Sequence, residues 1–273
     1  GKFSSDSYKN ASGLNGIGGS CVCLSSKEFQ VRSIRNGVCA SASFIKGELT
    51  FYTETPTAEK NGTEIRFTPD PEVFCNGEIG YSYERVCEDI KNISYLYSGI
   101  TFAVTGKLID GTESNVTYCA KNGITDFIKD NMTKPLHKHI ITASAENESD
   151  SVEIAFQWGS RRETSFVFVN GLRCPEGGTP ITGAKASITK TFNNLADAKF
   201  DGDKIREGLF FVVNCKVANP SFANQTKSKI NNASLRTLAS NAFNNALKEM
   251  KEEHPGDFDA IVELMKKLAI NNQ

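Results

Sequence analysis

Residues 208–217 form a nearly unbroken apolar run, GLFFVVNCKV, and Asn219-Pro220 follows it. The run is far shorter than the roughly 20 apolar residues that span a bilayer. Its length and its aromatic and β-branched side chains predict a β-strand that is buried on both faces. The sequence therefore predicts a domain built around a buried sheet.

The surrounding sequence predicts an α+β block that starts near Pro135 and ends in helices. Three segments have the composition of strands: Ile140–Ala145, Val152–Trp158 and Thr164–Val169. Apolar residues recur at three- and four-residue steps in three later segments, which predicts helices over 181–195, 235–250 and 258–269. The last two of these helices are separated by His254-Pro255-Gly256.

The first half of the chain has the marks of a second α+β region. Two alternating stretches, 29–34 and 38–44, flank Asn36-Gly37, and this pair predicts a hairpin. Further strands are predicted at Ile65–Phe67, Ile100–Val104 and near Val116–Tyr118, with helices over 81–97 and Ile124–Met132.

A glycine-rich segment, Gly13-Leu14-Asn15-Gly16-Ile17-Gly18-Gly19, precedes an apolar stretch that predicts a helix. Glycines let a backbone approach a ligand closely, and free N–H groups at a helix start favour phosphate. No Gly-Lys-Ser/Thr follows and no buried strand precedes, so neither the P-loop nor the dinucleotide fingerprint is met. Such a loop is otherwise an ordinary tight turn.

A second candidate is Gln225-Thr226-Lys227, in a polar stretch between the buried strand and a helix. A lysine there is either a solvated surface charge or a cation aimed at a terminal phosphate. Spacing alone does not connect it with the glycine-rich segment.

Composition narrows the classes of function. The chain has 31 Lys and Arg residues against 32 Asp and Glu, so its formal net charge is −1. This balance argues against a nucleic-acid clamp that works by bulk positive charge. The eight Cys and eight Asn-x-Ser/Thr triplets raise the alternative of a secreted, disulfide-bonded binding module. Most cysteines lie in apolar stretches and there is no CxxC pair, so buried free thiols are the preferred interpretation. His137-x-His139 is interpreted as a strand repeat rather than a metal site.

Several ordered motifs resemble the ATPase subunits of type IIA DNA topoisomerases, the gyrase B and topoisomerase IV B family. The resemblance spans most of the chain, and the matching motifs are Gly1-Lys2-Phe3, Asp6-Ser7-Tyr8-Lys9, Gly13–Gly18, Asn61-Gly62-Thr63, Phe67-Thr68-Pro69-Asp70, Gly177-Gly178-Thr179 with Gly183 and Lys185, Arg206-Glu207-Gly208-Leu209, and Asn219-Pro220-Ser221-Phe222 with Gln225-Thr226-Lys227. Asn15 replaces the His of bacterial members, and Ser12 stands where they have a first Gly.

The resemblance implies roles for twelve residues. Backbone amides of the glycine-rich segment would hold the ATP phosphates, Lys2, Tyr8 and Lys9 would lie on the ATP lid, Thr63 would face the adenine pocket, and Gln225 and Lys227 would reach the γ-phosphate. The segment's residues are Gly13, Leu14, Asn15, Gly16, Ile17 and Gly18.

The resemblance also implies the domain organisation. Residues 1–133 would be the C-terminal part of a GHKL ATPase domain, 134–235 a ribosomal-S5-like transducer domain, and 236–273 helices that lead toward a TOPRIM domain. We expect a fragment that starts at the ATP lid, because the family's general-base Glu and Mg²⁺-binding Asn precede the lid. We expect no metal ligands within it, and neither tight ATP binding nor hydrolysis by this chain alone.

The implied activity is ATP-driven DNA strand passage in the cytoplasm, with ATP and Mg²⁺ as cofactors. The implied partners are DNA, a gyrase A or topoisomerase IV A-like subunit, and a second ATPase subunit when ATP binds; no membrane association is expected. The alternatives are another GHKL ATPase of the MutL or Hsp90 type and the secreted module. The sequence does not separate gyrase from topoisomerase IV.

Overall fold

A computed structural model describes residues 17–74, 79–108, 110–159 and 162–270 of the chain. These residues divide into two compact units, one that runs from Ile17 to Ser82 and one that runs from Tyr83 onward. Both units combine helices and strands, so the expected α+β class is confirmed. The domain boundaries expected near residues 133 and 235 stay predictions.

The first unit is a helix followed by a four-stranded antiparallel sheet. Its elements are α1 (Ile17–Leu24), β1 (Ser26–Arg35), β2 (Val38–Ile45), β3 (Glu48–Pro56) and β4 (Gly62–Pro69), and the strand order is β3-β2-β1-β4. The predicted hairpin joins β1 to β2. Asn36 and Gly37 have φ angles of 53° and 79°, which suit the left-handed turn that this hairpin requires.

The two faces of this sheet differ in polarity. Cross-strand pairs place Phe29 beside Phe44 and Phe67, and Val31 beside Ile65, on one face. The pairs on the other face join Arg32 to Ser41 and to Glu64, because successive residues point to opposite faces. The sheet thus has one apolar and one largely polar face.

The second unit contains a five-stranded sheet of order β10-β9-β11-β8-β7. Its strands are β7 (Ile141–Glu146), β8 (Asp150–Trp158), β9 (Thr164–Val169), β10 (Leu172–Arg173) and β11 (Leu209–Val217). The central strand β11 is antiparallel to β8 and parallel to β9. Helix α4 (Thr179–Ala196) lies in the connection between the parallel strands, as a crossover requires.

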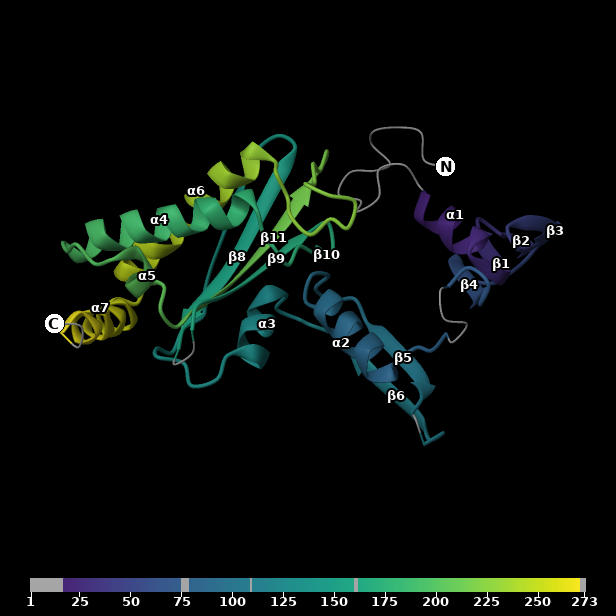
Figure 1. The fold of residues 1–273 in the computed structure, drawn as a ribbon, viewed down its shortest axis with the longest axis horizontal. Helices are drawn as coiled ribbons and strands as arrows, with labels where there is room; N and C mark the ends of the chain where they lie inside the picture. Colours follow the sequence, from purple (N-terminus) through teal and green to yellow (C-terminus); the bar gives the residue numbers. More distant parts are fainter. Residues whose placement is uncertain (1–16, 75–78, 109, 160–161, 271–273) are drawn as a thin grey trace. The chain divides into compact units, whose positions relative to one another are not determined.

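The apolar run of the sequence is indeed a strand buried on both faces. Phe211 and Val213 belong to a core shared with α4, α6 (Ala233–Glu253) and α7 (Pro255–Ile270). Phe210 and Val212 belong to a second core with Phe127 of α3 (Ile124–Asn131). Figure 1 shows α4 and α6 together on one side of the sheet and α3 on the other.

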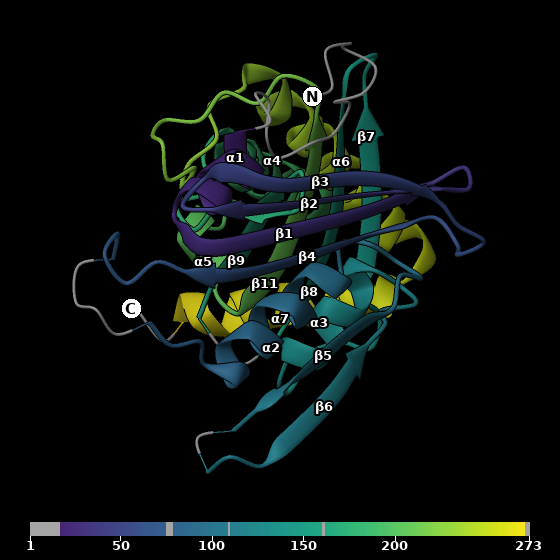
Figure 2. The same ribbon diagram turned by 90° about the vertical axis from the view of Figure 1, so that its right-hand side faces the viewer.

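A helix and a hairpin precede α3. Helix α2 (Tyr83–Ser94) packs against β5 (Phe102–Lys107) and β6 (Glu113–Tyr118), which pair with each other and are visible beside it in Figure 2. A turn at Asp110-Gly111 joins the two strands, and Gly111 has a φ of 83°. These elements confirm the pattern expected for residues 81–132.

Two elements were not predicted, and one expectation about local structure was wrong. Strand β3 was not predicted at all. The short helix α5 (Gly202–Ile205) was not predicted either, and Asp201 caps it by accepting a hydrogen bond from the Asp203 N–H at 2.9 Å. His137-x-His139 is not a strand repeat, because both residues lie in an irregular segment before β7.

Candidate functional site

The predicted site residues fall into three groups. Those expected on the lid and in most of the glycine-rich segment lie outside the described residues: Lys2, Tyr8, Lys9, Gly13, Leu14, Asn15 and Gly16. Ile17, Gly18 and Thr63 lie in the first unit, and Gln225 and Lys227 lie in the second.

Ile17 and Gly18 are the first two residues of α1. The first N–H groups of a helix have no partner within it, and they carry the positive end of the helix dipole. Both residues are exposed, and among the described residues a Cβ built on Gly18 meets nothing within 4 Å. The sequence of α1, IGGSCVCL, contains no acidic side chain that would oppose an anion. This helix end therefore offers open space and suitable polarity for a phosphate.

Thr63 is the second residue of β4 and pairs with Ser33 of β1. Alternation along β4 places it on the same face as Ile65 and Phe67, which are 53% and 45% exposed. An apolar face with a hydroxyl at its end suits a flat, partly polar ring.

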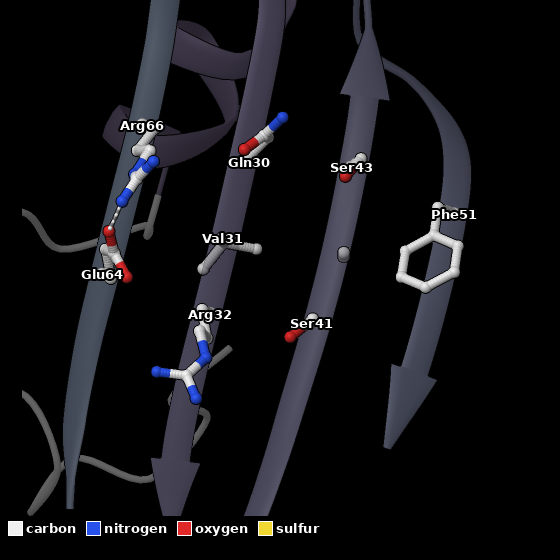
Figure 3. A pocket seen from close by; sticks show the side chains of 9 residues that line it. Gln30, Val31, Arg32, Ser41, Ser43, Phe51, Glu64 and Arg66 are labelled. Atoms are coloured by element: carbon white, nitrogen blue, oxygen red, sulfur yellow. Dashed lines mark hydrogen bonds and ion pairs between the residues drawn. The ribbon is translucent and has the colours of Figure 1, made fainter. Parts of the chain in front are cut away.

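The polar face of the same sheet carries a shallow hollow of about 250 Å³ (Figure 3). Its lining residues are Gln30, Val31, Arg32, Ser41, Ala42, Ser43, Phe51, Glu64 and Arg66. Arg66 and Glu64 pair with each other along β4 at one edge of the hollow, with the Arg66 Nε 2.8 Å from Glu64 Oε1. Since Thr63 is adjacent to Glu64 in the strand, its side chain points to the other face, and the hollow is not part of the predicted site.

Gln225 and Lys227 lie in the loop that joins β11 to α6. The loop is closed at its base by Asn232, whose side-chain oxygen accepts the Ser221 N–H at 2.7 Å and whose amide donates to the Asn219 carbonyl at 2.9 Å. In the strand before the loop, every residue except Lys216 is buried. The loop thus extends from a rigid support.

The tip of the loop is organised by Asn224. Its side-chain oxygen accepts hydrogen bonds from the Ser228 N–H at 3.1 Å and from the Thr226 hydroxyl at 3.0 Å. Its carbonyl accepts the Lys227 N–H at 3.1 Å. Lys227 has a left-handed backbone with φ 57°, which this tight turn imposes. Gln225 and Thr226 are left exposed at the tip.

The ammonium of Lys227 lies over the ring of Phe222, 5.8 Å from its centroid. This cation–π contact orients the lysine within the loop. A positive side chain beside an exposed amide, on a fixed turn, can bind an anionic oxygen.

Sequence reasoning missed the residues that hold this loop. Asn224 and Asn232 were noticed only as parts of Asn-x-Ser/Thr triplets. The signal for Asn224 was available, because an Asn before a polar turn commonly accepts hydrogen bonds from backbone N–H groups that follow it. Asn232 bridges residues that are 11 and 13 positions away, so its role depends on the fold.

The described residues give little evidence for a metal site, a disulfide, a reactive thiol or a membrane span. Among them, no group of three or more His, Cys, Asp or Glu side chains is placed to hold a metal ion. The seven cysteines in the described ranges are all free. Burial raises the pKa of the Cys174 thiol to about 11, so this thiol stays protonated. In the same part of the chain, no helix has the length and apolarity to cross a membrane.

Comparisons with known proteins agree with one another. A family profile described as DNA gyrase B matches residues 123–273, more than half of the 273-residue chain. A DNA gyrase B protein from Synechocystis is 33% identical over 96% of this chain, and one from Streptococcus pyogenes is 31% identical over 96%.

The chain spans only part of these relatives, 26% of the Synechocystis protein and 42% of the Streptococcus protein. The crystal structure of the 43K ATPase domain of Thermus thermophilus gyrase B has the same fold, with a TM-score of 0.78 and 24% identity. That match covers 93% of this chain and 72% of the Thermus chain. The chain belongs to the DNA gyrase B family.

Proposed function

We propose that this chain is part of the ATP-hydrolysing subunit of a type IIA DNA topoisomerase, which couples ATP turnover to DNA strand passage. One observation carries the proposal: Lys227 and Gln225, in a chain of this family, stand on a loop that hydrogen bonds fix at the end of a buried strand. Because the chain spans 26–42% of the length of these relatives, strand passage would be an activity of the whole protein.

The nucleotide would be held mainly through its phosphates. The start of α1, at Ile17 and Gly18, supplies N–H groups and a positive dipole end in open space, which fits a phosphate group. Thr63 would contact the adenine from the apolar face of β4. The lid and glycine-rich residues outside the described ranges take the roles that the family resemblance implies.

Lys227 would contact the γ-phosphate and Gln225 would lie beside it. ATP, when bound, supplies the phosphoanhydride bond that is cleaved. A cation at the terminal phosphate stabilises the negative charge that develops during phosphoryl transfer. The same contact distinguishes ATP from ADP, since only ATP offers a γ-phosphate, so the loop would report the nucleotide state to the second unit.

Mg²⁺ would accompany the bound ATP. We propose that its ligands and the general base belong to the part of the family's ATPase domain that precedes the lid. This chain alone would then neither bind ATP tightly nor hydrolyse it.

DNA, a gyrase A or topoisomerase IV A-like subunit and a second copy of the ATPase subunit are the proposed partners, and the cytoplasm is the proposed location. The net charge of −1 supports DNA contacts made mainly by other parts of the assembly. The seven free thiols in the described ranges oppose the secreted, disulfide-bonded alternative. The family match opposes the MutL and Hsp90 alternatives.

Steady-state ATP hydrolysis by the complete ATPase polypeptide that contains this sequence tests the proposal. Replacing a charge that acts in the transition state typically costs a factor of about 10²–10³ in kcat, so Lys227→Ala should lose turnover to that extent. Lys229→Ala is the matched control, because it removes an exposed lysine two residues along the same loop. Equal turnover in the two variants would contradict the proposal.

A further inference from the structure

The segment Gly177-Gly178-Thr179 runs along the inner side of the loop that carries Lys227. The Glu176 N–H donates to the Ser228 carbonyl at 3.0 Å, and the Ile230 N–H donates to the Gly177 carbonyl at 3.0 Å. The Thr179 N–H in turn donates to the Ile230 carbonyl at 3.1 Å. These three backbone hydrogen bonds attach the part of the loop that directly follows Lys227 to the glycine segment.

Both glycines are required by this attachment. Gly178 has a φ of 118°, and a Cβ there would lie 2.0 Å from the Ile230 carbonyl oxygen. Gly177 has a φ of 64°, and its Cβ would lie 2.4 Å from Ile181 Cγ1. Any side chain at these positions would displace the loop or the segment, because the clash at Gly178 is with backbone.

Side chains strengthen the same attachment. The Thr179 hydroxyl donates to the Asn232 carbonyl at 2.7 Å, and the Ser228 hydroxyl donates to the Glu176 carboxylate. Ile230 is fully buried between these contacts. The loop is therefore held at its base by Asn232 and along one side by the glycine segment.

The attachment ends on two helices of the core. Helix α4 begins at Thr179 and α6 begins directly after Asn232. The two helices pack closely: a Cβ on Gly183 would lie 2.1 Å from the Arg236 carbonyl oxygen, and the Ser187 hydroxyl donates to the Ser240 carbonyl at 2.8 Å. The helix pair thus resists a displacement of the loop. Any displacement that does occur is transmitted to the start of α4.

We propose that Gly177-Gly178-Thr179 is a positioning segment that fixes Lys227 for its contact with the γ-phosphate and couples the loop to α4. The inference rests on the proposed function of Lys227. None of the three residues reacts: they act through the backbone of Ser228–Ile230.

Hydrogen exchange measures the attachment on this chain without nucleotide. Losing one hydrogen bond in a native structure raises local opening about tenfold. Thr179→Val, which keeps the shape but loses the hydroxyl, should therefore accelerate exchange of the Ile230 amide about tenfold, while amides of the β8–β11 ladder stay unchanged. Thr179→Ser should restore the slow exchange. Unchanged exchange in Thr179→Val, or equal acceleration in Thr179→Ser, would overturn the attachment.

Kinetics of the complete ATPase polypeptide measure the positioning. Misplacing a catalytic cation lowers the rate of the chemical step, so Thr179→Val should lower kcat about tenfold with KM for ATP unchanged, and Thr179→Ser should restore kcat. Gly178→Ala should act in the same direction, whereas Gly111→Ala, at a positive φ of 83° in the turn between β5 and β6, should not.

A loosened loop with normal kcat would overturn the positioning role. The two proposals fail differently: if Lys227→Ala left turnover intact, the function of Lys227 would be wrong, whereas the exchange experiment would still decide whether the segment holds the loop.

Discussion

At the scale of single residues, the molecule uses asparagines and histidines as hydrogen-bonding centres. Asn224 and Asn232 shape the loop that carries Lys227. His137 is buried, and its Nε2 accepts the Trp158 N–H at 3.0 Å. Since Nε2 accepts, the proton of the neutral ring lies on Nδ1, which is 3.4 Å from Asp257 Oδ2. Nδ1 makes no hydrogen bond at this distance, and it is His139, whose backbone N–H donates to Asp257 Oδ2 at 2.9 Å, that joins the segment before β7 to the start of α7.

This arrangement predicts a pH dependence of stability. Burial lowers the pKa of His137 from 6.5, against the opposing effect of Asp257. The unfolded chain then binds more protons than the folded one below that pH, so stability is complete above about pH 6.5 and is lost as the pH falls. In urea unfolding, the free energy of unfolding should decrease from pH 7 to pH 5, and His137→Gln should flatten that decrease. An unchanged slope in the variant would contradict this explanation.

Asp257 adds to the same trend at lower pH. Although burial opposes the shift, hydrogen bonds from the backbone and ring of His139 lower the pKa of Asp257. Its contribution is therefore present above the unfolded pKa of 3.8 and is lost in stronger acid. The window of His137 lies higher, so the two contributions can be separated.

The sequence indicated some of these residues and not others. Gln225, Thr63 and Lys227 were identified because their motif order resembles a family, and their roles remain proposals. Asp257 and His137 are 120 positions apart in the chain, and no local pattern pairs them. This pair was missed because it forms only when α7 packs beside the segment that precedes β7.

At the scale of elements, the pattern of apolar residues predicted helices and strands correctly where their side chains are buried. Strand β11 was predicted from its apolar run, and both of its faces are covered by core residues. Strand β3 was missed because it is exposed along almost its whole length, so its sequence, ELTFYTETP, shows no clean alternation. The glycine of Lys46-Gly47 was a signal for the turn before β3. In the structure this pair has φ angles of 49° and 84°, like those of the predicted Asn36-Gly37 turn.

The contact between α4 and α6 predicts a sharp difference between two glycines. Gly183 faces the Arg236 carbonyl oxygen, which a Cβ would approach to 2.1 Å. Despite the better helix propensity of Ala, Gly183→Ala should destabilise the protein by about 2 kcal/mol through overpacking. Gly256→Ala is the matched control: Gly256 lies in α7 with open space around it, and the change should stabilise by up to about 0.5 kcal/mol. Denaturant midpoints of the two variants measure this, and equal effects would refute the close helix contact.

At the scale of the whole molecule, the two units differ in how much apolar surface they bury. The sheet of the second unit is enclosed by two cores. In the described part of the first unit, the buried apolar side chains are Phe29, Ile34 and Cys39, and large apolar residues such as Ile65 remain exposed. The first unit should therefore be the less stable of the two.

The central claim concerns the whole ATPase polypeptide: Lys227 contacts the γ-phosphate. Calorimetric binding of a non-hydrolysable ATP analogue and of ADP tests it most directly, with Lys229→Ala as control. A hydrogen bond to a charged group contributes roughly 1.5–3 kcal/mol, so Lys227→Ala should weaken binding of the ATP analogue by about 10- to 100-fold. ADP, which lacks the γ-phosphate, should bind the variant as it binds the unmodified protein. A loss that is equal for the two nucleotides, or no loss for either, would contradict the claim.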